Sequence, residues 1–239
     1  MVRNLFNLLP IPILEMIKIL EKQIWHLAYV VISIILFTVI LPLGNFLDGE
    51  LFGKPTLFWV ITAICMDISH HVYVLFCWRI QLKYQWFTKK IGQKGFKLYV
   101  LGFFILFFAR IISVFLAGYS NLNSLNVQPI ILYIIAGLIS VPMIYSFYSV
   151  GRYFGMYRAA GADHFDPSYK NKPFVKQGIY KYTNNAMYKF ALLIIWIPGL
   201  IFASESALLL ALFNHIHVWV HYYTLELPDM QKIYVTSIK

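Results

Sequence analysis

The chain has 239 residues, of which 60% are hydrophobic and only 13% are charged. Soluble domains carry about 25% charged residues, so this composition excludes an ordinary water-soluble fold and predicts a membrane protein. The formal net charge of +10 would suggest nucleic-acid binding in a soluble protein. In a membrane protein it marks the cytoplasmic loops instead, and no nucleic-acid partner is expected.

Six apolar stretches are long enough to cross a bilayer and predict an all-α, polytopic membrane bundle. A helix lying along the membrane surface is expected first, over residues 12–25, where Glu15, Lys18 and Lys22 form a polar stripe. The predicted spans then follow at Leu27–Leu43, Leu57–Trp78, Leu98–Gly118, Ile130–Val150, Ala186–Ala203 and Ala207–Leu225. The last two form a tight C-terminal hairpin.

Basic loops alternate with neutral or acidic loops at every predicted crossing. Lys and Arg crowd the segments 79–97 and 151–185, whereas the loop 119–129 carries no charge. The positive-inside rule then places both termini in the cytoplasm, either of a bacterial inner membrane or of the endoplasmic reticulum. The chain divides into a surface helix (1–26), a four-helix platform (27–150) and a functional core (151–239).

Two opposite charges are predicted to lie at matching depth inside the bundle. Asp67 in the second span and Arg110 in the third each lie about 16–18 Å from the cytoplasmic end, at 1.5 Å per residue. A pair facing the bundle interior would reduce the cost of burying each charge. The pair either fixes the helix register or contacts a substrate headgroup or phosphate.

Two histidines, His70 and His71, follow Asp67 one helical turn closer to the cytoplasm. The Asp-x-x-His-His string resembles one His box of the membrane di-iron desaturases and hydroxylases. Those enzymes need several boxes, so no metal site is expected from this one. His70 and His71 either line a headgroup cavity or make ordinary hydrogen bonds between helices.

A stripe of aromatic and polar residues runs along the last predicted span. At 100° per residue, His215, Trp219, Tyr222 and Glu226 fall on one face, whereas His217 and His221 point elsewhere. Two rings that lead to a carboxylate at the cytoplasmic boundary suit a bound cation. The alternative is a belt of interfacial aromatic residues with a solvated glutamate.

Three short motifs in residues 148–234 resemble the intramembrane methyltransferases, which include phosphatidylethanolamine N-methyltransferases and isoprenylcysteine carboxyl methyltransferases. They are Gly151-x-x-x-Gly155, the Asn-Ala-Met-Tyr string at 185–188, and Glu226-Leu-Pro followed by Ile233-Tyr234. Order and spacing are closest to the phospholipid branch. The chain departs from that pattern at Ala186, where the family has proline, and at Leu227, where it has a second glutamate.

This resemblance implies that S-adenosylmethionine binds at the cytoplasmic ends of the last helices. Glu226 would hold its ammonium group or ribose hydroxyls, and Gly151 and Gly155 would permit close backbone approach. The cofactor-binding residues expected from the motifs and the nearby tyrosines are Gly151, Gly155, Tyr180, Tyr182, Asn185, Tyr188, Tyr222 and Glu226. An amine substrate must lose a proton before attack, and either His221 or His164 would accept it.

The expected partner is a membrane lipid, whose headgroup would contact Asp67, His70, His71 and Arg110. The first hypothesis is N-methylation of phosphatidylethanolamine or its methylated derivatives. The second is O-methylation of an isoprenylcysteine carboxylate or another lipid-borne nucleophile, which Arg152 and Arg158 would favour. The third, from a different class, is a transporter or a non-enzymatic lipid-binding protein.

Overall fold

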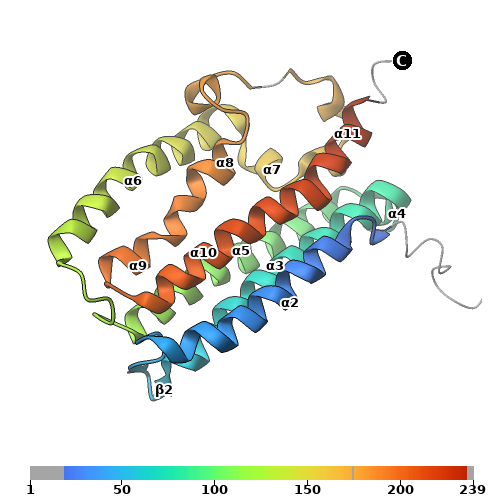
Figure 1. Cartoon of the computed structure of the whole chain (residues 1–239). Coiled ribbons are helices and arrows are strands. Elements are labelled where there is room, and N and C mark those ends of the chain that lie inside the picture. Colours follow the sequence, from blue (N-terminus) through green and yellow to red (C-terminus); the bar gives the residue numbers. More distant parts are fainter. Residues whose placement is uncertain (1–18, 174, 236–239) are drawn as a thin grey trace, which may run out of the picture.

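The computed structural model describes residues 19–173 and 175–235. Four of its helical segments are long and apolar enough to cross a membrane, which confirms the all-α membrane class (Figure 1). They are α2 (Gln23–Ile40) with the short η2 (Leu41–Leu43), α3 (Thr56–Tyr84), α5 (Gln93–Ser120), and α6 (Pro129–Ser149) with η3 (Val150–Phe154). The predicted surface helix falls mostly on residues outside the described ranges, and α2 already begins at Gln23.

The ends of these helices follow from local backbone chemistry. Pro129 occupies the first turn of α6, where its missing N–H costs no hydrogen bond. Gln85 at the end of α3 and Gly92 before α5 both have positive φ, so the chain reverses through α4 (Trp86–Ile91) between the two long helices. At the opposite end of the bundle, β1 (Glu50–Leu51) and β2 (Lys54–Pro55) form a small antiparallel hairpin between α2 and α3.

The C-terminal part of the chain alternates short helices with loops and then ends in one long helical run. The short elements are α7 (Met156–Ala159), η4 (Ala162–His164), η5 (Pro167–Asn171), η6 (Gly178–Lys181), α8 (Ala186–Lys189), η7 (Ala191–Ile195) and α9 (Ile197–Ile201). The long run consists of α10 (Glu205–His221), η8 (Tyr222–Glu226) and α11 (Leu227–Val235).

The structure does not confirm six spans. The predicted fifth span, Ala186–Ala203, is a broken segment of α8, η7 and α9 rather than one continuous helix. The chain leaves regular α-helix at Phe190 and continues as a tighter 3₁₀ helix until Trp196, and Pro198 then opens α9. The predicted sixth span corresponds to α10, whose 17 residues are followed by the π-helical turn η8.

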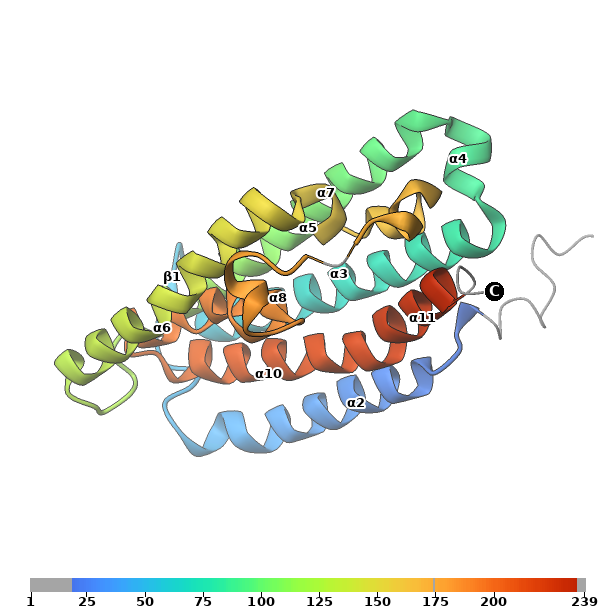
Figure 2. The same cartoon turned by 90° about the horizontal axis from the view of Figure 1, so that it is seen from above.

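The helix α10 packs within the bundle, against α2, α3 and α5 (Figure 2). Their shared core includes Phe37, Val60, Val114, Leu210 and Phe213, one or more from each of the four helices. α6 instead packs on η7 and α9. The helix α10 therefore completes the hydrophobic core formed by α2, α3 and α5. The division into a platform and a functional core at residue 151 stays a prediction.

Both ends of the described chain lie at the same end of the bundle. The start of α2 and the end of α11 are neighbours there, together with α4 and α7, while the β1–β2 hairpin lies at the opposite end (Figure 1). The two basic loops therefore gather on one side. This arrangement agrees with the sequence pattern behind the predicted cytoplasmic termini, whose orientation stays a prediction.

Cysteine labelling would test this orientation. In a chain whose own Cys65 and Cys77 are replaced, we expect an impermeant thiol reagent added outside intact cells to label Asn126→Cys but not Lys170→Cys. Both positions are exposed, so neither substitution disturbs the core. Labelling at 170 with protection at 126 would reverse the assigned orientation, and permeabilised cells should expose both positions as a control.

Candidate functional site

A cavity lies between α3, α5, α6, α8 and α10, and we name it the aromatic cavity. Its empty space is about 890 Å³ with the open mouth included. Its aromatic lining is Phe103, Phe104, Phe107, Phe147, Trp78 and Tyr188. The polar lining at its inner wall is His70, His71, Arg110 and His221. The cavity is therefore largely apolar, with a few basic side chains on one side.

Two of these histidines lack partners within the described part of the chain. Neither ring nitrogen of His70 has a hydrogen-bond partner there, and neither does Nδ1 of His221, although both side chains are buried. Buried polar groups in native proteins nearly always have a partner. Both residues line the aromatic cavity, so a ligand in that cavity is the natural source of the missing hydrogen bonds.

The predicted pair between Asp67 and Arg110 is confirmed. Arg110 Nε lies 2.7 Å from Asp67 Oδ1, and both side chains are almost fully buried. Arg110 Nε also donates to Asn214 Oδ1 at 2.5 Å, so α10 joins the pair. Asn214 is a residue that the sequence analysis missed, because an uncharged side chain on an apolar helix gives no depth-matching signal.

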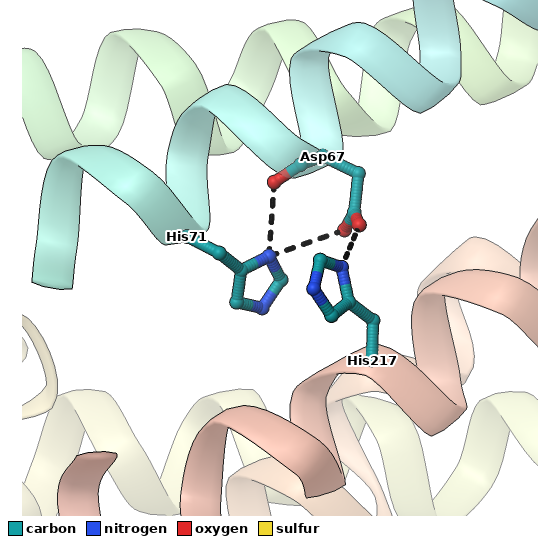
Figure 3. A group of neighbouring side chains, drawn as sticks. All are labelled: Asp67, His71 and His217. Atoms are coloured by element: carbon teal, nitrogen blue, oxygen red, sulfur yellow. Dashed lines mark hydrogen bonds and ion pairs between the residues drawn. The ribbon is translucent and has the colours of Figure 1, made fainter. Parts of the chain in front are cut away.

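Asp67 also organises two histidines from different helices. His71, one turn along α3, places its Nδ1 2.9 Å from the Asp67 backbone oxygen, and His217 on α10 donates from its Nδ1 to the Asp67 carboxylate (Figure 3). The predicted substrate-binding residues therefore divide into two groups. His70 lines the aromatic cavity, whereas Asp67 does not. His71 and Arg110 line the cavity and also contact Asp67.

The predicted stripe on the last helix gathers around Tyr188. Its hydroxyl donates to Glu226 Oε2, and its ring contacts Trp219 and Tyr222 with centroids 6.0 and 5.7 Å away. His215 lies apart from this group and accepts a hydrogen bond from Trp196 Nε1 at 3.3 Å when its Nδ1 is unprotonated. Tyr188 also lines the aromatic cavity, so Glu226 lies one side chain away from it.

The environment of Glu226 makes its ionisation unfavourable. Burial raises the pKa of Glu226 to about 7, with the neighbouring carboxylates of Asp163 and Asp229 acting in the same direction. The hydrogen bond from Tyr188 opposes this rise, because it favours the charged form. A carboxyl with a pKa near neutrality is partly charged at pH 7. A cationic ligand beside Glu226 would lower this pKa and favour the charged carboxylate.

The glycine motif lies where the backbone is open. A side chain at Gly151 or Gly155 would meet no distant atom within 4 Å, and Gly155 has φ +94°, a conformation that side chains rarely adopt. Tyr180 is buried and stacks on Phe154, with ring centroids 5.3 Å apart. Asn185 precedes α8, and Tyr182 is 79% exposed and contributes nothing to the enclosed part of the site.

The second candidate base, His164, does not line the aromatic cavity. Its ring stacks on Trp78 with centroids 4.1 Å apart, and its Nε2 lies 3.5 Å from Asp229 Oδ2. Asp229 also binds Arg79, whose Nε is 2.9 Å from Asp229 Oδ1. His164 is therefore held in a network that joins α3 to α11.

A second network, which the sequence analysis did not predict, joins the segment 158–163 to α11. Arg158 donates to the hydroxyl of Tyr234 at 2.9 Å and pairs with Asp163 at 3.3 Å, and Tyr234 donates to Asp163 as well. Tyr234 was singled out only as part of a motif. Its structural partners are 71 and 76 residues away in sequence, which no local pattern reveals.

The comparison with known families concerns this same part of the chain. Residues 127–237 match the phospholipid methyltransferase family. The match confirms the recognition made from the three motifs and extends it from α6 to α11. No curated protein and no solved structure matches the chain.

The family is one of membrane methyltransferases that generally use S-adenosylmethionine. The matched residues include Tyr188 and His221, which line the aromatic cavity, and Glu226, which accepts from Tyr188. The helices α3 and α5, which also line this cavity, lie outside the match.

The buried pair has a measurable energetic signature. Arg110→Met or Asp67→Asn should each lower the free energy of unfolding by about 3–5 kcal/mol, because each leaves one group buried without its partner. The double variant should lose less than the sum of the two. Arg152→Met, at an exposed arginine, is the matched control and should change little. Losses that simply add in the double-mutant cycle would show that the two groups do not interact.

Proposed function

We propose that this chain is an S-adenosylmethionine-dependent methyltransferase that methylates the amine headgroup of phosphatidylethanolamine or of its partly methylated forms. The observation that carries the proposal is the continuity of the aromatic cavity. The cavity extends from phenylalanines on the membrane helices α5 and α6 to Tyr188, which holds Glu226. An amphipathic substrate and a water-soluble cofactor can therefore meet inside one enclosure.

The lipid side of the cavity suits acyl chains. Phe104 on α5 and Phe147 on α6 line it from two sides. The outer faces of these helices carry exposed apolar side chains, such as Ile105 and Ile144, which are 59% and 62% exposed and would contact lipid. A headgroup that entered between these faces would reach His70 and His221, which need hydrogen-bond partners.

The residues at the cytoplasmic end fit the cofactor. Glu226 offers a carboxylate for an ammonium group or ribose hydroxyls, Tyr188, Trp219 and Tyr222 offer aromatic faces for a cation, and Gly155 leaves its backbone open. When bound, S-adenosylmethionine supplies an electrophilic methyl group on a sulfonium. The protein must then exclude water and align the acceptor with that methyl group.

His221 is the group best placed to prepare an amine acceptor. It lines the cavity and its Nδ1 has no partner in the described structure, so a neutral imidazole there can accept a proton from the headgroup ammonium. The N–H bond electrons would then remain on the substrate nitrogen as a lone pair, which would form the new bond to the methyl carbon as the carbon–sulfur bond breaks and its electrons pass to sulfur. His70 lies on the same wall and can hold the headgroup during this step.

The arginines disfavour the carboxylate acceptor of an isoprenylcysteine. Arg158 is occupied by Asp163 and Tyr234, Arg110 is paired with Asp67, and Arg152 is exposed. None of them is free inside the cavity to hold a substrate carboxylate. O-methylation therefore ranks second, and a non-enzymatic lipid carrier ranks third because it would leave the cofactor end without a role.

Purified protein with methyl-labelled S-adenosylmethionine would test the proposal against a panel of acceptors in vesicles. We expect transfer to phosphatidylethanolamine or its mono- or dimethyl forms, and none to a prenylcysteine. His221→Gln should lower the rate about 10²–10⁴-fold at neutral pH, the usual contribution of a general base, and less at high pH where the amine deprotonates alone. His215→Gln, six residues away on the same helix, is the control. Transfer to the prenylcysteine alone would replace the proposal with the second reaction, and no transfer to any acceptor would reject both.

Cofactor affinity should depend on the ionisation of Glu226. With its pKa at about 7, the charged fraction rises from about a tenth at pH 6 to about nine-tenths at pH 8, so affinity measured by calorimetry should rise close to tenfold over that range. Glu226→Gln should bind about 10–150-fold more weakly at pH 8 and lose that rise. Glu50→Gln, in the β1–β2 hairpin, is the control.

The same residue predicts a stability effect of defined sign. The pKa of Glu226 is raised on folding, so its neutral form stabilises the folded state below the unfolded value of 4.5, and this contribution is lost as pH rises through about 7. Ligand-free Glu226→Gln should therefore melt no lower than the wild type at pH 8. A marked loss of thermal stability there would mean that the variant perturbs folding rather than the cofactor site.

A further inference from the structure

A second cavity lies between α2, α3 and α10, and we name it the histidine cavity. It encloses about 670 Å³ of empty space with its open mouth included. Its polar lining consists of Gln23, His26, His71 and His217, and every other lining residue is apolar. The three histidines come from three different helices and are at most 8% exposed. His71 also lines the aromatic cavity, where its ring lies 4.9 Å from that of His221, whereas His26 and His217 line the histidine cavity alone.

The hydrogen bonds around these histidines fix their tautomers. His217 Nδ1 faces the Asp67 carboxylate, and His71 Nδ1 faces the Asp67 backbone oxygen at 2.9 Å. His26 Nδ1 faces Gln23 Oε1 at 3.1 Å, and the amide nitrogen of Gln23 is directed to the Thr224 carbonyl at 3.2 Å. All three acceptors are oxygens without a proton, so each Nδ1 carries the hydrogen.

A neutral imidazole has only one N–H, so each Nε2 is left with a lone pair. Yet His26 Nε2 and His217 Nε2 lie only 2.6 Å apart. Two lone pairs at that distance repel unless a cation lies between them. A shared proton would serve this pair alone, whereas a metal ion would also use the lone pair of His71, which lines the same cavity.

We propose that His26, His71 and His217 bind a transition-metal ion of the zinc type through their Nε2 atoms, with the fourth coordination position facing the histidine cavity. Asp67 lies behind His217 and holds its ring by accepting from Nδ1 (Figure 3). That is the carboxylate–histidine–metal arrangement, in which an outer carboxylate fixes the tautomer and orientation of a ligand. A backbone carbonyl and an amide oxygen do the same for His71 and His26.

The spacing of the rings agrees with one shared ion. With zinc–nitrogen bonds of about 2.0–2.1 Å and tetrahedral angles, ligand nitrogens lie about 3.3 Å apart and ring centroids about 5 Å apart. The observed centroid distances are 4.0 Å for His71–His217, 4.6 Å for His26–His217 and 5.6 Å for His26–His71. Binding therefore requires His217 to move away from His71 by about 1 Å and from His26 by about 0.4 Å, and His26 and His71 to approach each other by about 0.6 Å.

The chemistry of the ligands selects the metal. Neutral imidazoles suit zinc, copper, nickel or iron, whereas magnesium and calcium need several oxygen ligands. Asp67 is the nearest carboxylate, and Arg110 at 2.7 Å already offsets its charge. A bound divalent ion would keep net positive charge, so an anionic fourth ligand such as hydroxide would be favoured. The cavity gives that ligand a path to the ion.

This site departs from the sequence-based expectation of no metal. The Asp67-x-x-His70-His71 string on one helix is too small to build such a site, and within it only His71 would be a ligand. The other two ligands are 45 residues before and 146 residues after His71 along the chain. The proposal does not depend on methyl transfer, because metal content can be measured without any substrate.

The test is zinc binding by the full-length chain, purified without a histidine tag in detergent. We expect about one zinc ion per chain after saturation and removal of excess metal, measured by elemental analysis. His217→Gln and His26→Gln should each weaken binding more than about tenfold, as seen by competition with a zinc-binding dye. Zinc should also raise the melting temperature of the wild type but not of these two variants.

His215→Gln is the matched control, two residues from His217 on α10 and directed at Trp196, and it should bind zinc like the wild type. If His217→Gln fails to fold, His26→Gln decides, because His26 is the most exposed of the three histidines, at 8%. Wild-type protein that takes up no zinc, copper or nickel would overturn the proposal and leave a shared proton between His26 and His217. Zinc bound equally by all four proteins would also overturn it.

Discussion

A carboxylate buried in the middle of a membrane helix is the constraint on which the rest of this structure depends. Asp67 is fully buried and contacts Arg110 from α5 and His217 from α10. Leaving such a charge unpaired in a membrane costs several kcal/mol, so α3, α5 and α10 must keep their relative heights. With α3, α5 and α10 held at these positions, Asp67 and its partners lie between the aromatic cavity and the histidine cavity. His71 lines both cavities.

The positions of two charged residues along their predicted spans were enough to predict one contact of this arrangement. Asp67 and Arg110 lie at matching depths in neighbouring spans, and the pair is present as predicted. Of the helical stripe that led to Glu226, Trp219, Tyr222 and Glu226 gather around Tyr188, whereas His215 faces Trp196 instead. Both predictions used a single helix or a pair of adjacent helices. Whether Glu226 binds a cofactor, and whether His70 and His221 contact substrate, are proposals that rest on this geometry and on the family match.

Contacts between distant helices could not be predicted in the same way. Nothing in the sequence around His26 indicates that its ring lies against His217, 191 residues away. The broken segment between Ala186 and Ile201 was predicted to be one span because it is apolar apart from Lys189. Hydropathy reports the environment of a segment and not the continuity of its backbone hydrogen bonds. His164, named with His221 as a possible base, is enclosed by Trp78 and Asp229.

The π-helical turn η8 explains how one helical run can serve two different partners. Its N–H groups bond five residues back, as Leu227 does to the Tyr222 carbonyl, so side chains beyond it are rotated relative to a continuous α-helix. Before and within the turn, Trp219, Tyr222 and Glu226 face Tyr188. Beyond it, Asp229 faces Arg79 and Tyr234 faces Arg158. Without the extra residue in that turn, anchoring α11 to α3 and to the loops would rotate Glu226 away from Tyr188. A single backbone irregularity therefore lets the anchoring contacts and the proposed cofactor contacts form together.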